Sequence, residues 1–207
     1  SSLAKKPALW QAILLPDSTI SDLENAALSA NALMTNNARD AKLKDHEFDV
    51  TIVSQSSKSI TYKGMVLPTK FADFFLDLKD TDFTAYASQV HGRQATNTSP
   101  LWRNAQPCSV AMAHNGELNS RGTNAVKDML ATARDGFTPN LSLSDSIQFD
   151  AHLGNLLLHG KSLEEAFVEL MSVPYPKDYN QNVQDLLEYK RLHTTPYNGP
   201  AFMVASH

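Results

Sequence analysis

Several features are scarce or missing in this chain, and each absence excludes a class of protein. The single cysteine, Cys108, excludes an internal disulfide framework and any metal or iron–sulfur site built from cysteines alone. No apolar run approaches the roughly 18 residues that a membrane-spanning helix needs. No basic run is longer than Lys5-Lys6, and the formal net charge is −4, so a nucleic-acid surface is not expected. The eight glycines form no Gly-x-Gly-x-x-Gly loop for phosphate.

These absences predict a cytoplasmic protein that contacts neither nucleic acid nor membrane, and the rest of the composition is ordinary for a globular chain. Of 207 residues, 42% are hydrophobic and 19% are charged, which suits one domain with a sizeable core. Strands and helices are expected in runs, which favours an α+β fold over a parallel sheet. Helices are expected over residues 18–41, 68–78, 122–134, 144–159, 162–173 and 182–193. Strands are expected over residues 48–54, 59–63, 83–91, 109–113 and 202–205, the first two forming a hairpin.

Residues 91–98, at the end of a predicted strand, form the first of three segments rich in functional groups. The Arg93 guanidinium can hold a carboxylate through two parallel hydrogen bonds, and nearby hydroxyls can fix the loop around it. The alternative is a solvated loop with a surface arginine, which this segment alone favours.

The second segment spans residues 113–119, where a short apolar strand runs into a polar turn. An asparagine amide and a glycine backbone N–H that project together make an oxyanion hole, which stabilises negative charge on a carbonyl oxygen. Asn115 and Gly116 are the candidates, because glycine lets the backbone approach a ligand closely. The alternative is a plain Asn-Gly hairpin turn.

The third segment spans residues 144–150 and contains Asp145 at a predicted helix start. Asp145 and Gln148 have the spacing of a helix-capping pair. The functional alternative is a carboxylate, fixed at the helix start, that takes the ammonium group of an amino-acid ligand. Both interpretations use the same oxygens.

Together the three segments resemble one protein family. The sequences HGRQATNTSPLW, AHNGELN and SDSIQFD occur in the order and approximate spacing of class II glutamine amidotransferases, specifically the glutaminase domain of glutamate synthase. SSKSITYKGMVLP is similar to that family's hairpin and following turn, and TPYNGPA to its closing strand. The resemblance covers most of the chain from about Ser21 onward.

The resemblance implies a fold and a set of site residues. The fold would be that of N-terminal-nucleophile hydrolases, an αββα sandwich of antiparallel sheets, here a single domain over residues 1–207 that is incomplete at its N-terminus. Arg93 would bind the α-carboxylate of glutamine, Asp145 would bind its α-ammonium, and Thr96 would shape the pocket. Asn115 and Gly116 would supply the oxyanion hole.

The nucleophile is the main departure from the family pattern. The family uses a cysteine at the mature N-terminus, whose thiolate attacks the amide carbon and leaves a hydrolysable thioester. This chain begins at Ser1, a formal alternative nucleophile, and Cys108 lies where the family has no catalytic residue. We therefore expect the glutamine-recognition half of a glutaminase, which a cysteine from a missing N-terminal segment completes.

The expected partners follow from the same resemblance. They are glutamine, a synthase domain or subunit that accepts ammonia, and the missing segment or a homo-oligomer partner that covers exposed sheet edges. No cofactor is expected in this chain, because the synthase's flavin and iron–sulfur chemistry would lie elsewhere. The main alternative is a non-catalytic glutamine sensor or interaction module with a degenerate glutaminase fold. A serine amidohydrolase that uses Ser1 is a third hypothesis.

His152 and His159 lie on one face of a predicted helix and invite a metal-site interpretation. A metal site needs a third ligand, and no His-Glu-x-x-His spacing is present. We expect structural histidines and no metal.

Overall fold

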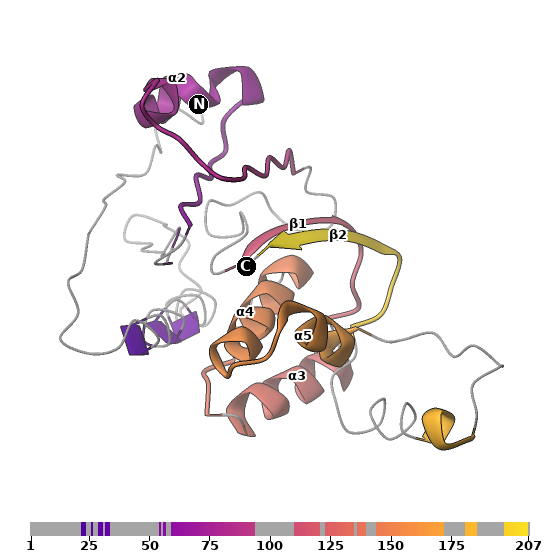
Figure 1. Cartoon of the computed structure of the whole chain (residues 1–207). Helices are drawn as coiled ribbons and strands as arrows, with labels where there is room; N and C mark the ends of the chain where they lie inside the picture. The colour runs from indigo at the N-terminus through magenta and orange to yellow at the C-terminus, as the bar shows by residue number, and fades with distance from the viewer. Residues whose placement is uncertain are drawn as a thin grey trace, which may run out of the picture.

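A computed structural model describes residues 22–23, 26, 29–30, 32–33, 54, 56, 59–93, 110–120, 123–134, 136–139, 144–171, 181–185 and 197–206. Its elements, in chain order, are the 3-10 helix η3 (Pro68–Lys70), α2 (Phe71–Phe74), the 3-10 helix η4 (Leu76–Lys79), β1 (Ala111–Gly116), α3 (Thr123–Arg134), α4 (Asp145–Leu158), α5 (Leu163–Leu170) and β2 (Ala201–Ser206). The two strands lie across α4 and α5, and α3 lies on the other side of α4 (Figure 1). Helices and an antiparallel strand pair confirm the α+β class.

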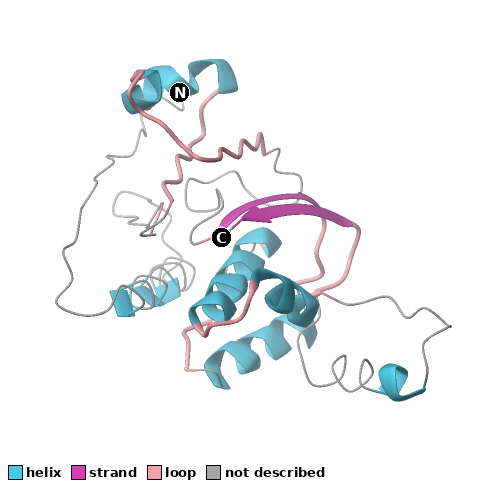
Figure 2. Ribbon diagram, in the orientation of Figure 1, coloured by secondary structure: helices cyan, strands magenta, loops and turns pink. Residues whose placement is uncertain are grey.

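The central helix α4 owes its position to an apolar face. Phe149, Leu153, Leu156 and Leu157 recur at helical spacing and are all buried. This face packs against α5, whose start is fixed by a capping box in which Ser162 and Glu165 exchange side-chain and backbone hydrogen bonds. Figure 2 shows α3, α4 and α5 beneath the strand pair.

The strands β1 and β2 run antiparallel, with Ala111 opposite Ser206 and Gly116 opposite Ala201. Alternate residues of β1 face the helices, so Met112 and His114 are buried. The core cluster joins the sheet to α4 and α5, and consists of Val110, Met112, Leu118, Phe149, Leu153, Leu156, Leu157, Ala166, Leu170 and Tyr197. On β2, Phe202 and Val204 are 69% and 47% exposed.

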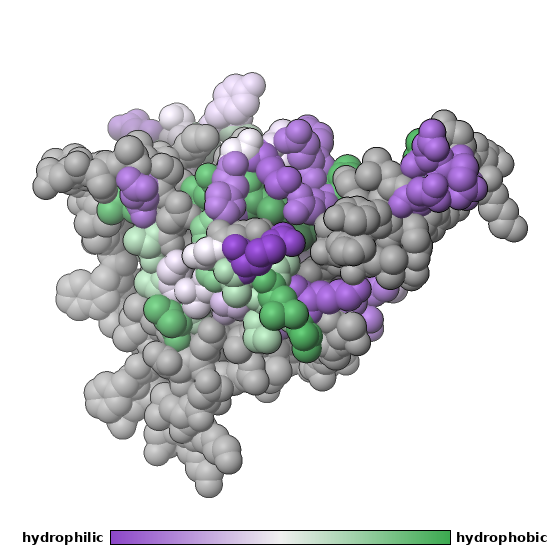
Figure 3. Space-filling model, turned by 90° about the horizontal axis from the view of Figure 1, so that it is seen from below, coloured by the Kyte–Doolittle hydropathy of each residue, from purple (hydrophilic) through white to green (hydrophobic). Residues whose placement is uncertain are grey.

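The outer side of α3 also carries apolar residues. Val126 and Leu130 are exposed there. Figure 3 views the molecule from below and shows hydrophobic and hydrophilic residues side by side on the described part of this face. Single exposed apolar side chains among polar ones are normal for a protein surface.

The sequence predicted most of these elements. The helices expected over 122–134, 144–159 and 162–173 are α3, α4 and α5, and α5 ends earlier, at Leu170. The strands expected over 109–113 and 202–205 are β1 and β2. The described residues of 22–33 and 181–185 are helical, which agrees with the first and last predicted helices. The helix expected over 68–78 is three short pieces, η3, α2 and η4.

Two predicted strands, 59–63 and 83–91, are wrong, because neither segment is a strand in the structure. In the first segment, serine hydroxyls accept hydrogen bonds from backbone N–H groups that a strand would donate to its partner. Ser54 Oγ accepts from the Thr61 N–H at 2.9 Å, and Ser56 Oγ accepts from the Ser59 N–H at 3.2 Å. The second segment is exposed throughout, so no apolar face holds it in a sheet. The strand expected over 48–54 lies outside the described residues except for Ser54.

Past the ends of the ladder, two glycines let the chains approach closely. The Glu117 N–H donates to the Pro200 carbonyl at 3.0 Å, and the Asn119 N–H donates to the Asn198 carbonyl at 2.7 Å. Gly116 has φ 143°, and a Cβ there would lie 2.1 Å from the Pro200 oxygen. Gly199 has φ 134°, and a Cβ there would lie 2.0 Å from the Glu117 oxygen. Both positions therefore require glycine.

Substituting Gly116 with alanine is expected to lower the free energy of unfolding by about 3 kcal/mol, measured by urea denaturation. The cost combines backbone strain of about 1–2 kcal/mol with the displacement of Pro200. Gly136→Ala is the matched control for strain alone, because Gly136 has φ 85° and nothing lies within 4 Å of a Cβ there. Equal losses in the two variants would contradict the close-approach explanation.

Candidate functional site

The end of β1 carries the two residues expected to form an oxyanion hole. Asn115 and Gly116 belong to the strand itself, so the hairpin-turn alternative is wrong. Because Glu117 donates to Pro200, the ladder alternation makes Gly116 and Ala201 a non-hydrogen-bonded pair. The Gly116 N–H is thus directed away from β2. Asn115 is exposed and faces opposite to the buried His114.

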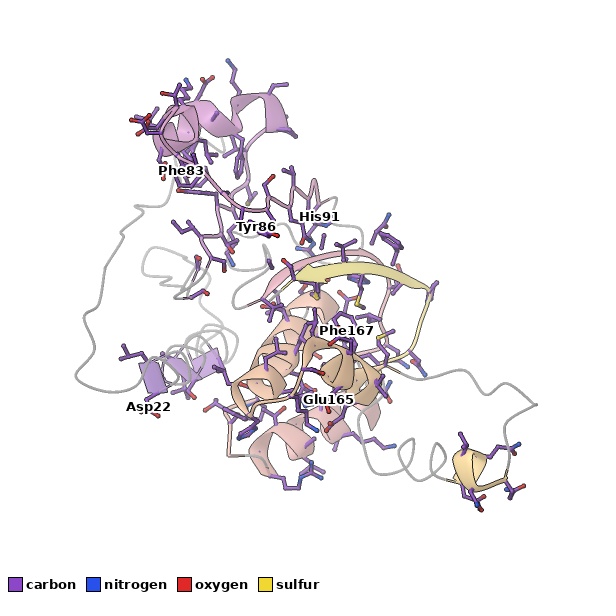
Figure 4. All side chains as sticks on the ribbon, viewed as in Figure 1. Asp22, Phe83, Tyr86, His91, Glu165 and Phe167 are labelled. Carbon is purple, nitrogen blue, oxygen red and sulfur yellow. The ribbon has the colours of Figure 1, made fainter. Side chains whose placement is uncertain are left out.

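Arg93 reaches the start of α4, although the two are far apart in sequence. Its Nη2 lies 3.5 Å from Ser144 Oγ, and Ser144 is the fully buried residue that precedes Asp145. Arg93 itself is half-buried. The extended segment that ends at Arg93 is tied to the sheet by Gln89, whose side-chain amide donates to the Val204 carbonyl at 3.2 Å. Figure 4 shows His91, from this segment, beside the strands.

The Asp145 carboxylate joins the start of α4 to the chain after β1. Oδ2 accepts from the Leu118 N–H at 2.9 Å, while Oδ1 accepts from the Ser146 N–H at 2.7 Å and from the Ser146 hydroxyl at 3.1 Å. The capping arrangement with Gln148 is wrong. The N-cap is Ser144, Asp145 is the first helical residue, and Gln148 donates its backbone N–H to the Ser144 carbonyl.

His114 and His91 add to this cluster, and sequence reasoning did not single out either. His114 Nδ1 lies 2.8 Å from Ser146 Oγ. Burial lowers the pKa of His114, Asp145 opposes that shift, and the positive charges of His91 and Arg93 add to it. The pKa of His91, which remains exposed, is also lowered, by partial desolvation and by the positive charge of Arg93. Arg93 contacts Ser144 and His114 contacts Ser146, the residues on either side of Asp145.

The structure thus brings part of the predicted site together. Arg93 contacts Ser144, the residue before Asp145, and Asp145 accepts from the Leu118 N–H, two positions after Gly116. The Asn115 side chain lies on the other face of the sheet from His114. Thr96, Cys108 and Ser1 lie outside the described residues.

A second buried polar group lies behind this cluster. His152 of α4 hydrogen-bonds through Nδ1 to Asp128 of α3, and both residues are 5% exposed. Burial and the Asp128 carboxylate raise the pKa of Tyr197 well above its usual value. His159 packs against Phe137 with ring centroids 4.4 Å apart. His152 and His159 thus both contact other side chains of the protein, and the described residues hold no cluster of three metal-ligating side chains.

The chain belongs to the class-II glutamine amidotransferases, because that family matches it over residues 1–207. Within the family it is of the glutamate synthase type. It is 33% identical over 176 residues to ferredoxin-dependent glutamate synthase 2 of Synechocystis sp., an alignment that covers 76% of this chain and 11% of the relative. It is 34% identical over 170 residues to the NADH glutamate synthase of Schizosaccharomyces pombe, which covers 74% of this chain and 8% of the relative.

The chain thus spans about a tenth of the length of these curated relatives. No solved structure matches it significantly. Among the described residues, none of the helices has the length and apolar character to cross a membrane.

Proposed function

We propose that this chain is the glutaminase domain of a glutamate-synthase-like amidotransferase, which hydrolyses glutamine to glutamate and ammonia. The observation that carries the proposal is the meeting of Arg93 with the Ser144–Asp145 helix start, next to the end of β1. Free glutamine carries a carboxylate and an ammonium on one carbon, so its pocket must present opposite charges close together. The Arg93 guanidinium contacts the residue that precedes Asp145, so a guanidinium and a carboxylate are available at the same helix start.

The hydrogen-bond capacity of Asp145 supports its role toward the ammonium. An ionised carboxylate has about four acceptor positions. Donors among the described residues use two on Oδ1 and one on Oδ2, which leaves, within that part of the chain, one position on Oδ2 for a ligand donor. Arg93 would take the α-carboxylate with two parallel hydrogen bonds, and Thr96 would shape the pocket wall.

The end of β1 would supply the oxyanion hole. The Gly116 N–H is directed away from β2 and is thus presented at the other edge of β1. The exposed Asn115 amide would provide the second donor. Two such donors stabilise the oxyanion that forms when a thiolate attacks the glutamine amide carbon.

The remaining parts of the proposal concern the whole protein. A single domain would span residues 1–207, with β1 and β2 in one sheet of an αββα sandwich. The cysteine nucleophile would come from a segment N-terminal to this chain, and ammonia would pass to a synthase domain or subunit. The alternative of a non-catalytic glutamine sensor keeps the same recognition residues but forms no thioester.

Calorimetry with glutamine and its blocked derivatives tests the recognition site. L-Glutamine is expected to bind, whereas N-acetylglutamine and glutamine α-amide each lose one charged contact and bind about tenfold more weakly or worse, since a hydrogen bond to a charged group contributes about 1.5–3 kcal/mol. Equal affinity for all three ligands would contradict a pocket that binds both the α-carboxylate and the α-ammonium of glutamine.

Ammonia release separates the enzyme from the sensor. A longer polypeptide that includes a cysteine-initiated upstream segment is expected to release ammonia from glutamine, and alkylation of that cysteine is expected to stop the release. Glutamine binding without release in that polypeptide would favour the sensor. Release by the present chain that Ser1→Ala abolishes would instead favour the serine amidohydrolase.

A further inference from the structure

His114 is the one buried polar residue of β1 that faces the start of α4. It is 6% exposed and lies on the inner face of the strand, between the buried Met112 and the glycine at the strand end. Its Nδ1 contacts Ser146 Oγ at 2.8 Å, and Ser146 in turn contacts Asp145 Oδ1 through its hydroxyl and its backbone N–H. A continuous hydrogen-bonded chain therefore runs from His114 to the carboxylate.

The direction of this chain follows from its two ends. The ionised Asp145 carboxylate can only accept, so the single hydroxyl hydrogen of Ser146 points to Oδ1. The Ser146 oxygen must then accept from His114, which places the imidazole proton on Nδ1. In the neutral ring Nε2 is an acceptor, and it is buried without a hydrogen-bond partner among the described residues.

The charges around His114 favour that neutral ring. Burial lowers the pKa of His114, and the nearby His91 and Arg93 lower it further, while Asp145 acts in the opposite direction. Protonation at Nε2 would place a positive charge in a buried site that already holds Arg93. That positive charge would also attract the Asp145 carboxylate and would compete with the ammonium of a ligand for it.

We propose that His114 is a positioning residue of the glutamine site: its Nδ1–H fixes the Ser146 hydroxyl on Asp145 Oδ1, and so keeps Oδ2 aimed at the Leu118 N–H and at the ligand's ammonium. The inference rests on the function proposed above. Its consequence is that glutamine binding weakens in acid, as the pH falls through the lowered pKa of His114 and the ring takes up a proton. A charge within a few ångströms of the carboxylate is expected to weaken binding about tenfold.

The test compares variants that keep or remove the Nδ1 donor. His114→Asn retains a donor near the Nδ1 position and cannot titrate, so it is expected to bind L-glutamine like the parent chain at pH 7.5 and to lose the weakening in acid. His114→Ala and Ser146→Ala are each expected to bind about tenfold more weakly at pH 7.5, and the double variant no more weakly than either one.

Two controls separate positioning from packing and from the neighbouring histidine. Met112→Ala removes a buried side chain from the same face of β1, so it is expected to destabilise the fold and leave the pH profile of glutamine binding intact. His91→Gln removes the other nearby imidazole and should also retain the acid weakening. Acid weakening that survives in His114→Asn, or that disappears in His91→Gln, would overturn the inference.

Amide hydrogen exchange gives a readout that needs no ligand. The Leu118 N–H donates to Asp145 Oδ2, so its protection reports on the carboxylate. His114→Ala is expected to accelerate exchange at Leu118 about tenfold, and unchanged exchange there would overturn the positioning role. If the parent chain does not bind glutamine but the Leu118 exchange responds as expected, the proposed function is wrong and the positioning of Asp145 by His114 stands.

Discussion

Arg93→Lys is expected to weaken L-glutamine binding about tenfold or more, because an ammonium cannot reproduce the two parallel hydrogen bonds of a guanidinium to a carboxylate. Calorimetry at constant pH measures the change. Arg134→Lys, in the last turn of α3, is the matched control and is expected to bind like the parent chain. Arg93 lies at the start of α4, whereas Arg134 lies at the end of another helix.

Substitution of Asp145 tests the ammonium-binding side of the same pocket. Asp145→Asn removes the negative charge and is expected to weaken binding to a similar extent, with little loss of affinity for N-acetylglutamine, which lacks the ammonium. If Asp145 served only as a structural link to Leu118, its replacement by alanine would cost about 0.5–2 kcal/mol of stability and leave glutamine discrimination unchanged. That outcome, together with a neutral Arg93→Lys, would contradict the glutamine pocket.

His152→Ala is expected to lower the free energy of unfolding by about 3–5 kcal/mol, because it leaves the Asp128 carboxylate buried without its imidazole partner. Thermal or urea denaturation at pH 7 measures the loss. Lys161→Ala is the matched control: its ion pair with Glu169 is partly exposed, so about 1 kcal/mol or less is expected.

A double-mutant cycle shows whether the loss belongs to the pair. Asp128→Ala combined with His152→Ala is expected to cost clearly less than the sum of the single changes, since neither buried group is then left unpaired. Additive losses, or a His152→Ala loss no larger than that of Lys161→Ala, would show that the contact does not couple α3 to α4 energetically.

The helical layer could be predicted because its determinants are local. In α4, the spacing of Phe149, Leu153 and Leu156 defines a buried face without reference to the rest of the chain. Strands were less predictable, because a strand depends on the segment that pairs with it. Residues 83–91 have strand-like composition but remain exposed, whereas β1 pairs with β2 although residues 117–200 separate them in the sequence.

The residues of the site could be proposed from the sequence, but the contacts between them could not. Arg93 and Asp145 could be proposed from the motifs that contain them, but only tertiary structure brings Ser144 between them. His114 and Ser146 were missed because each looks like ordinary strand or helix sequence until their hydrogen bond is seen. A histidine within an apolar strand, next to the predicted oxyanion hole, was the available signal.

The pairing of β1 with β2 also determines when the site can form during folding. Helices α3, α4 and α5 lie in the chain between the two strands. Closing so long a loop is slow compared with forming helices, which takes about a microsecond or less. We therefore expect the helices to assemble first and the strands to pair late. During synthesis, the geometry at Gly116 cannot form before residues 198–201 have been added to the chain. A nascent chain that already contains Arg93 and Asp145 therefore still lacks the completed strand end.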